Sequence, residues 1–94
     1  MKTWSIYLVR CPDGSLYTGI SIDVRRRFKE HCSDKVRGAK FLRGKTPLSL
    51  VYQGEVGDKS SASKLEYRVK RLDKQRKEDL VAGNLSLEQL GLAL

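Results

Sequence analysis

The chain has 94 residues and a formal net charge of +8, with 39% hydrophobic and 32% charged residues. This length predicts one domain with a modest core. The composition excludes a disordered chain, and no apolar run approaches the ~20 residues of a membrane span. No signal-peptide-like segment stands before residue 4, so we expect a cytoplasmic protein without membrane contact. The positive charge favours a polyanionic partner such as nucleic acid.

The cysteines and the histidine limit the disulfide and metal chemistry that we expect. Cys11 and Cys32 are the two cysteines, and one disulfide between them is geometrically possible. Reduced thiols are the expectation for a cytoplasmic protein. With one histidine and no CxxC pair, the sequence does not predict a zinc site.

The chain opens with a predicted β-hairpin. Residues 4–10 and 15–20 are rich in aromatic and β-branched side chains, and Pro12-Asp13-Gly14 between them is typical of a turn. A three-residue turn places Tyr7 and Tyr17 on one face of the hairpin, whereas a four-residue turn places them on opposite faces. The sequence leaves both registers open.

The remaining elements follow in the order helix, strand, helix, helix. We expect a helix over 23–32 with Ser21 or Asp23 as its cap, a basic loop over 34–46 and a strand over 47–56. Apolar periodicity predicts a helix over 61–72, and a mostly solvated helix over 73–82 ends at Gly83. The leucine-rich tail 85–94 is expected to fold back over the sheet as a last helix.

One charge lies near the apolar side of the first predicted helix. Stepping 100° per residue from Val24, Phe28 lies about 40° away, His31 about 20° away and Arg27 about 60° away. Glu30 and the other charged residues of this helix point elsewhere, toward water. An arginine in this position must be paired or held ready for an anionic guest.

A second charge, Glu66, flanks the apolar stripe of the helix over 61–72. It lies about 40° from Ala62, on the side away from the rest of the stripe. Arg27 and Glu66 are open to three interpretations: a structural ion pair with each other, two side chains that each extend their charged end into water, or parts of a functional site. In the first case, replacing both with apolar residues should leave stability near normal and change no activity.

The motifs Ser5-Ile6-Tyr7 and Tyr17-Thr18-Gly19, followed by Arg27, His31 and Glu66, resemble the GIY-YIG nuclease domain in its small stand-alone, YhbQ-like bacterial branch. Ser5 replaces the first motif glycine and Thr18 the middle isoleucine. The resemblance covers about residues 4–75 of a single domain 1–94, with 76–94 as a C-terminal helical extension. It implies an α/β (α+β) fold: a three-stranded antiparallel sheet flanked by helices.

The resemblance also implies a metal-dependent DNA endonuclease that hydrolyses phosphodiester bonds with a single Mg²⁺ or Mn²⁺ ion. Tyr7, Tyr17, Arg27, His31 and Glu66 match the family's catalytic positions, and Glu66 matches the metal ligand. Arg27 would stabilise the charge that builds on the phosphate. Tyr7, Tyr17 and His31 all remain candidates for the general base.

Basic side chains would hold the DNA backbone without reading its sequence. The candidates are Arg25, Arg26, Lys29, Lys40, Arg43 and Lys45. No sequence-reading module is visible, which favours branched DNA or single-stranded/duplex junctions, a role in DNA repair or recombination, and a protein partner that could supply specificity. The alternative is a nucleic-acid-binding protein on the same fold with little or partner-dependent cleavage. A more distant alternative is a structural domain whose tail over 85–94 dimerises or docks.

Overall fold

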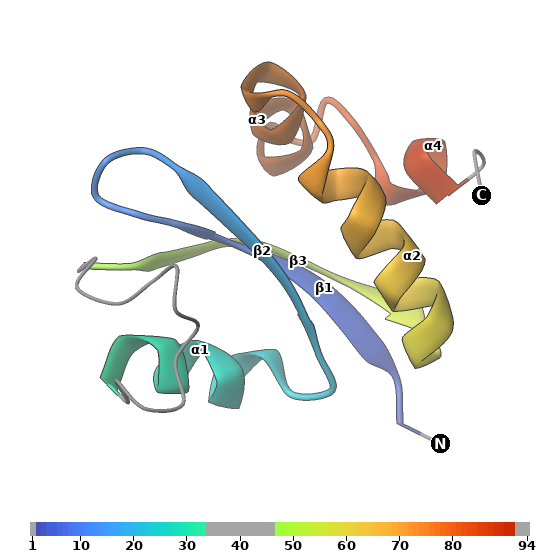
Figure 1. The fold of residues 1–94 in the computed structure, drawn as a ribbon, viewed down its shortest axis with the longest axis horizontal. Coiled ribbons are helices and arrows are strands. Elements are labelled where there is room, and N and C mark those ends of the chain that lie inside the picture. Colours follow the sequence, from blue (N-terminus) through green and yellow to red (C-terminus); the bar gives the residue numbers. More distant parts are fainter. Residues whose placement is uncertain (1, 34–46, 92–94) are drawn as a thin grey trace.

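The computed structural model describes residues 2–33 and 47–91. Three strands form one antiparallel sheet in the order β2-β1-β3, with helices on both sides (Figure 1). The predicted three-stranded α+β architecture is confirmed. The predicted basic loop, with Lys40, Arg43 and Lys45, lies outside the described residues. The elements are β1 (Trp4–Arg10), β2 (Leu16–Ser21), α1 (Val24–Ser33), β3 (Ser49–Gly57), α2 (Lys59–Lys70), α3 (Lys74–Ala82) and α4 (Leu87–Gly91).

The hairpin between β1 and β2 closes with a three-residue turn. The Cys11 N–H donates to the Ser15 carbonyl at 2.9 Å, which encloses residues 12–14. The register then pairs Tyr7 with Gly19, and Tyr17 lies two residues before Gly19 on the same strand. Because side chains alternate between the faces of a strand, both tyrosines lie on one face. The structure therefore selects the three-residue alternative.

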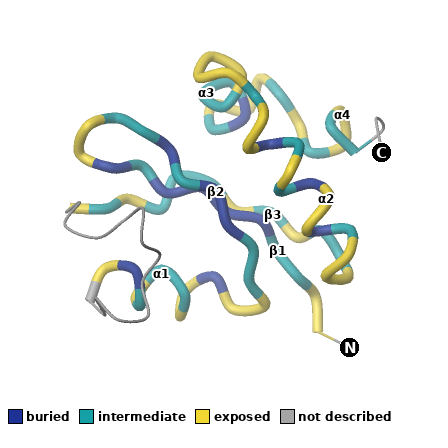
Figure 2. The backbone as a smooth tube through the Cα atoms, viewed as in Figure 1, coloured by how far each residue is buried: buried dark blue, intermediate teal, exposed yellow. Residues whose placement is uncertain are grey.

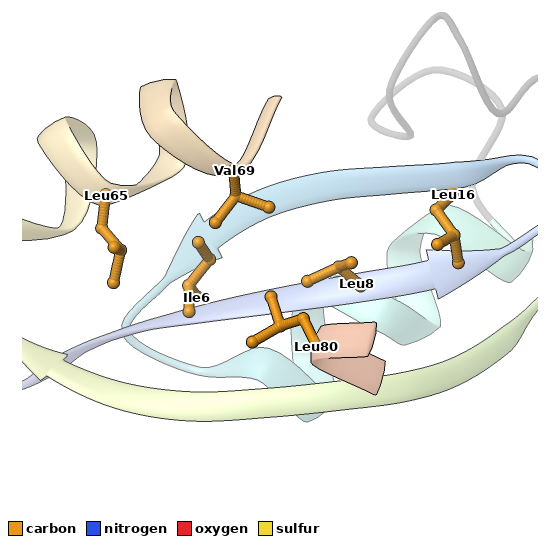
Figure 3. Close-up of a cluster of buried hydrophobic side chains, with 6 residues drawn as sticks. All are labelled: Ile6, Leu8, Leu16, Leu65, Val69 and Leu80. Atoms are coloured by element: carbon orange, nitrogen blue, oxygen red, sulfur yellow. The ribbon is translucent and has the colours of Figure 1, made fainter. Parts of the chain in front are cut away.

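The sheet separates two apolar clusters. On one face, Leu65 and Val69 of α2 and Leu80 of α3 pack against Ile6 and Leu8 of β1 (Figure 3). Figure 2 shows buried segments along β1 and β2 and at intervals along α2. Even-numbered residues of β1 thus form the main core, and the odd-numbered ones are left for the opposite face.

The opposite face is covered by α1. Val24 and Phe28 of this helix pack against Tyr7 and Val9 of β1. Asp23 caps the helix, as one of the two predicted alternatives, because its carboxylate accepts a hydrogen bond from the Arg26 N–H at 3.1 Å. The odd-numbered face of β1 and β2 is therefore held against a short, strongly basic helix.

Aspartate caps also set the starts of α2 and α3. The predicted start at residue 61 is wrong by two residues, since the Asp58 carboxylate accepts from the Ser61 N–H at 2.8 Å and α2 begins at Lys59. Asp73 caps α3 in the same way, and α3 ends at Gly83 with a left-handed φ of 87°. Such a φ is costly for residues other than glycine.

The leucine-rich tail folds back, as predicted, at least for residues 85–91. Leu85, Leu87 and Leu90 are partly buried and pack against the core cluster. Among the described residues, Ile22 and Tyr67 are the exposed large hydrophobic side chains. Residues 85–91 of the tail thus cover the core. No helix in the described part of the chain is long and apolar enough to cross a membrane.

A partly exposed ion pair connects α3 to the end of β1. The Arg10 guanidinium donates to both carboxylate oxygens of Glu78, at 2.7 Å and 2.6 Å. Lys74 also pairs with Glu78 at 2.9 Å. The hydrogen bonds from Arg10, followed by those from Lys74, lower the pKa of Glu78 to about 2. Helical periodicity alone did not indicate this contact, because its two sides lie 68 residues apart.

Candidate active site

Four of the predicted site residues meet on the face of the sheet that α1 covers. β1 provides Tyr7, β2 provides Tyr17, and α1 provides Arg27 and His31. The Tyr7 hydroxyl and His31 Nε2 are 2.8 Å apart. The Tyr17 ring lies 6.4 Å from the Tyr7 ring and 5.4 Å from the His31 ring, centre to centre. The three rings therefore form one contiguous cluster.

Gly19 makes this cluster possible. A Cβ atom at Gly19 would lie 2.6 Å from both Cζ and Oη of Tyr7, closer than real Cβ contacts come. The absence of a side chain lets the Tyr7 ring cross β2 and reach α1. A glycine within a strand marks such close approaches, so the sequence carried this signal. Its structural role, however, follows from the register and not from the motif alone.

His31 is held in its neutral form. The side chain is buried, and burial followed by the nearby Arg27 charge lowers the pKa of His31 to about 4, against a smaller opposing effect of Glu30. Tyr7 is only 1% exposed, and burial, with a further contribution from Tyr17, raises the pKa of its phenol. At neutral pH both groups are therefore uncharged.

Two contacts join these three side chains. Burial raises the pKa of Tyr7, and the charge of the neighbouring Arg27 guanidinium opposes that rise. The Tyr7 hydroxyl and His31 Nε2 share a hydrogen bond, whose direction is set by the histidine tautomer. The chain of contacts therefore runs from Arg27 through Tyr7 to His31.

Glu30 is the acidic partner of Arg27, which the sequence analysis missed. Arg27 Nη1 lies 2.9 Å from Glu30 Oε1, and the two side chains are 32% and 23% exposed. The prediction that Glu30 points toward water is wrong, because residues three apart on a helix are neighbours and the Glu30 carboxylate contacts Arg27. The arginine that was expected to need a partner or an anion has a carboxylate partner in this state.

Glu66 is the one of the five predicted catalytic residues that comes from α2, the helix on the opposite face of the sheet. It pairs with Lys70 at 3.3 Å. Its carboxylate is near enough to add to the effects of burial and Tyr17 that raise the pKa of Tyr7. Glu66 side-chain exposure is 23%, so its oxygens remain accessible.

The predicted DNA-binding residues of α1 lie beside the cluster. Arg25, Arg26 and Lys29 are exposed on the outer surface of the helix. Arg26 also approaches Glu30 at 4.0 Å, a distance that leaves its charge largely solvated. Cations thus surround the side of the site that faces water, and they can neutralise backbone phosphates.

The sequence and the fold both match known proteins. Residues 3–79 match the GIY-YIG catalytic domain. A UPF0213 protein of Cronobacter sakazakii is 51% identical over 90 residues, which are 96% of this chain and 93% of the relative. The UPF0213 protein YhbQ of Escherichia coli strain K12 is also 51% identical over 90 residues, covering 96% of this chain and 88% of YhbQ.

Two solution NMR structures share the architecture. A UPF0213 protein from Bacillus halodurans is 42% identical, with a TM-score of 0.54 over 85% of this chain and 83% of that chain. A protein from E. faecalis is 31% identical, with a TM-score of 0.60 over 92% of this chain and 91% of the other. The domain match, the bacterial relatives and the shared fold lead to one conclusion. This chain belongs to the GIY-YIG catalytic domain family, in the branch of small bacterial proteins that includes YhbQ.

Proposed function

We propose that this protein is a divalent-metal-dependent DNA endonuclease whose chemistry takes place at the Tyr7–Tyr17–Arg27–His31 cluster. GIY-YIG domains are nuclease domains, which supports phosphodiester hydrolysis in general. The observation that carries the proposal for this chain is the chain of contacts Arg27–Tyr7–His31. It combines a cation suited to phosphate with a neutral ring nitrogen suited to accept a proton.

The proton path follows the hydrogen bonds. The phenol of Tyr7 holds its proton at neutral pH, so it is not a base by itself. It can accept a proton from the attacking water at its oxygen while it passes its own proton to His31 Nε2. The water becomes hydroxide, Tyr7 is again a neutral phenol, and His31 becomes imidazolium. The substrate's negative charge favours that cationic form.

Arg27 has to change partners for this step. Tyr7 is buried, and Arg27 lies against it while it pairs with Glu30. A phosphate offers two oxygens to the guanidinium fork and is a stronger partner than the single carboxylate contact of Glu30. Binding of the phosphate to Arg27 would open the way to the Tyr7 hydroxyl. The half-buried Tyr17 ring forms the neighbouring wall that positions the water.

Glu66 would hold the metal ion. No three His, Cys, Asp or Glu side chains among residues 2–33 and 47–91 converge on a common metal position. A lone accessible carboxylate nevertheless fits Mg²⁺ or Mn²⁺, because such ions keep several waters and take further oxygens from substrate phosphate. When bound, the ion supplies polarisation of the phosphate and stabilisation of the leaving 3′ oxygen. Lys70 would give up its contact with Glu66.

The substrate we propose is DNA recognised by shape, in the cytoplasm. Arg25, Arg26 and Lys29 contact phosphates without reading bases. Branched DNA or single-stranded/duplex junctions in repair or recombination fit a small domain of this kind, and a protein partner could direct it to them. The alternative function, DNA binding with little cleavage, is favoured by one observation: the Arg27–Glu30 pair occupies the phosphate-binding arginine.

Cleavage of labelled branched, single-stranded and duplex DNA with Mg²⁺, Mn²⁺ or EDTA tests the proposal. We expect metal-dependent cleavage by the wild type and losses of about 10²–10³-fold in Arg27→Ala. His31→Ala and Glu66→Gln should also be inactive. Glu88→Gln on exposed α4 is the matched control for the loss of one carboxylate, and it should cleave normally. Full activity in Glu66→Gln and His31→Ala, or binding without any metal-dependent turnover, would overturn the proposal.

A further inference from the structure

A second basic surface lies away from the tyrosine–histidine cluster, on the outer side of α2. A groove of about 940 Å³ runs between this helix, the start of α3 and α4. We call it the α2–α4 groove and define it by Lys64, Tyr67, Arg68, Arg71, Arg76 and Leu90. α4 lies beside α2 at this position (Figure 1).

The charged side chains that line the groove are all positive. Four cationic side chains line it, and among the described residues no carboxylate does. Glu66, the acidic residue in the middle of α2, points elsewhere. Counting 100° per residue, Tyr67, Arg71, Arg68 and Lys64 lie about 100–200° around the helix from Glu66. The groove and the proposed metal ligand therefore occupy different flanks of the same helix.

An exposed aromatic ring lies among these cations. Tyr67 is 63% exposed, although large aromatic side chains usually cover apolar surface. The Arg71 guanidinium lies 5.4 Å from the centre of the ring and also donates to the Tyr67 hydroxyl at 3.2 Å. Tyr67 and Arg71 are one turn apart on α2, and both contacts between them hold the ring in place. An ordered, exposed ring flanked by cations is a stacking platform.

We propose that the α2–α4 groove binds a single nucleic-acid strand, with a base stacked on Tyr67 and the flanking phosphates on Lys64, Arg68, Arg71 and Arg76. Charge selects a polyanion, and the aromatic ring selects one with accessible base faces. A duplex keeps its bases stacked inside and can use only the cations. The site binds without cleaving, so it does not depend on the proposed nuclease activity.

Binding of a labelled oligo-dT strand, followed by fluorescence anisotropy in EDTA, tests the groove. Loss of the ring in Tyr67→Ala should weaken single-strand binding at least about five-fold, because base–aromatic stacking contributes on that scale. Tyr67→Phe keeps the ring and should bind within about two-fold of wild type. Binding of a duplex with matched charge should change less than two-fold in Tyr67→Ala.

The cations are tested through salt dependence. Arg68→Gln should reduce the slope of log affinity against log salt for the single strand by about 0.7, the value for one phosphate contact. Lys2→Gln removes the same charge from an exposed position outside the groove and should leave the slope unchanged. Equal effects of the two variants would mean diffuse attraction and would overturn the proposal.

Two further results would contradict the inference. Unchanged single-strand binding in Tyr67→Ala would show that no base stacks on Tyr67. If poly-glutamate binds as tightly and depends on Tyr67 in the same way, the ligand of the groove is an acidic protein and not a nucleic acid. Tyr67 variants should unfold at the wild-type temperature, since the ring is mostly exposed. If the wild type fails to cut DNA while the groove variants lose binding, the nuclease proposal fails and the groove stands.

Discussion

Replacing Gly19 with alanine should separate Tyr7 from His31 while the sheet stays intact. Gly19 pairs with Tyr7 across β1 and β2, and an added Cβ would lie 2.6 Å from Cζ and Oη of Tyr7. Ordinary carbon contacts need about 3.6 Å, so the ring must move by about 1 Å. The hydroxyl is 2.8 Å from His31 Nε2, and a shift of that size disrupts the distance and angle of this hydrogen bond.

The cost has two parts. Overpacking of a buried ring costs about 1–3 kcal/mol. The lost hydrogen bond adds about 1 kcal/mol. Gly19→Ala should therefore destabilise the protein by roughly 2–4 kcal/mol in urea denaturation. If the Tyr7–His31 contact carries the proton, cleavage by the folded fraction should fall about 10²–10⁴-fold, the range for lost general acid–base catalysis.

Gly54→Ala is the matched control. Its Cβ would lie 2.7 Å from Cδ1 of Leu87, an equally tight contact on the face that α2 covers. This variant should lose less stability than Gly19→Ala, because Cδ1 is the end of a flexible and partly buried side chain, and it should keep its activity per folded molecule. A second test is Tyr7→Phe, which removes the hydroxyl alone; combined with Gly19→Ala it should lose little further activity. Wild-type turnover in folded Gly19→Ala would refute the assignment of Tyr7 and His31 to the proton path.

Two further predictions concern pH. Folding lowers the pKa of His31 from 6.5 to about 4, so between these pH values the unfolded chain binds more protons than the folded chain. The contribution of the neutral His31 to the free energy of unfolding is therefore fully present above pH 6.5. It decreases by roughly 3 kcal/mol as the pH falls toward 4. His31→Gln should lack this part of the dependence in urea denaturation at pH 7 and pH 4.5, and identical profiles would argue against a buried neutral ring. Glu78→Gln should cost about 1 kcal/mol at pH 7, because the doubly hydrogen-bonded pair with Arg10 is partly solvated. The pKa of Glu78 is lowered to about 2, so this cost should shrink in thermal melts as pH falls from 4.5 toward 2; a cost that is constant over that range would contradict the pairing.

The strands, the helices and the positions of Tyr7, Tyr17, Arg27 and His31 on them could be predicted because they rest on local patterns. Alternation placed Tyr7 and Tyr17 on strands, and helical spacing placed Arg27 and His31 on one stripe. Local patterns do not carry information about what lies across the molecule. The turn register depends on a backbone hydrogen bond that either turn length could satisfy. Periodicity also gives the stripe of a helix but not the sheet face that it covers, so it did not show that α1 and α2 lie on opposite faces.

The strand β1 has a consequence for how this protein will respond to heat and to random substitution. Its odd positions supply Tyr7 to the rings and its even positions supply Ile6 and Leu8 to the core. Since one central strand carries both, opening of the site requires the same cooperative event as opening of the core. Core variants will then resemble catalytic variants in any screen that scores activity alone. Thermal loss of activity should coincide with global unfolding, without an earlier local transition of its own.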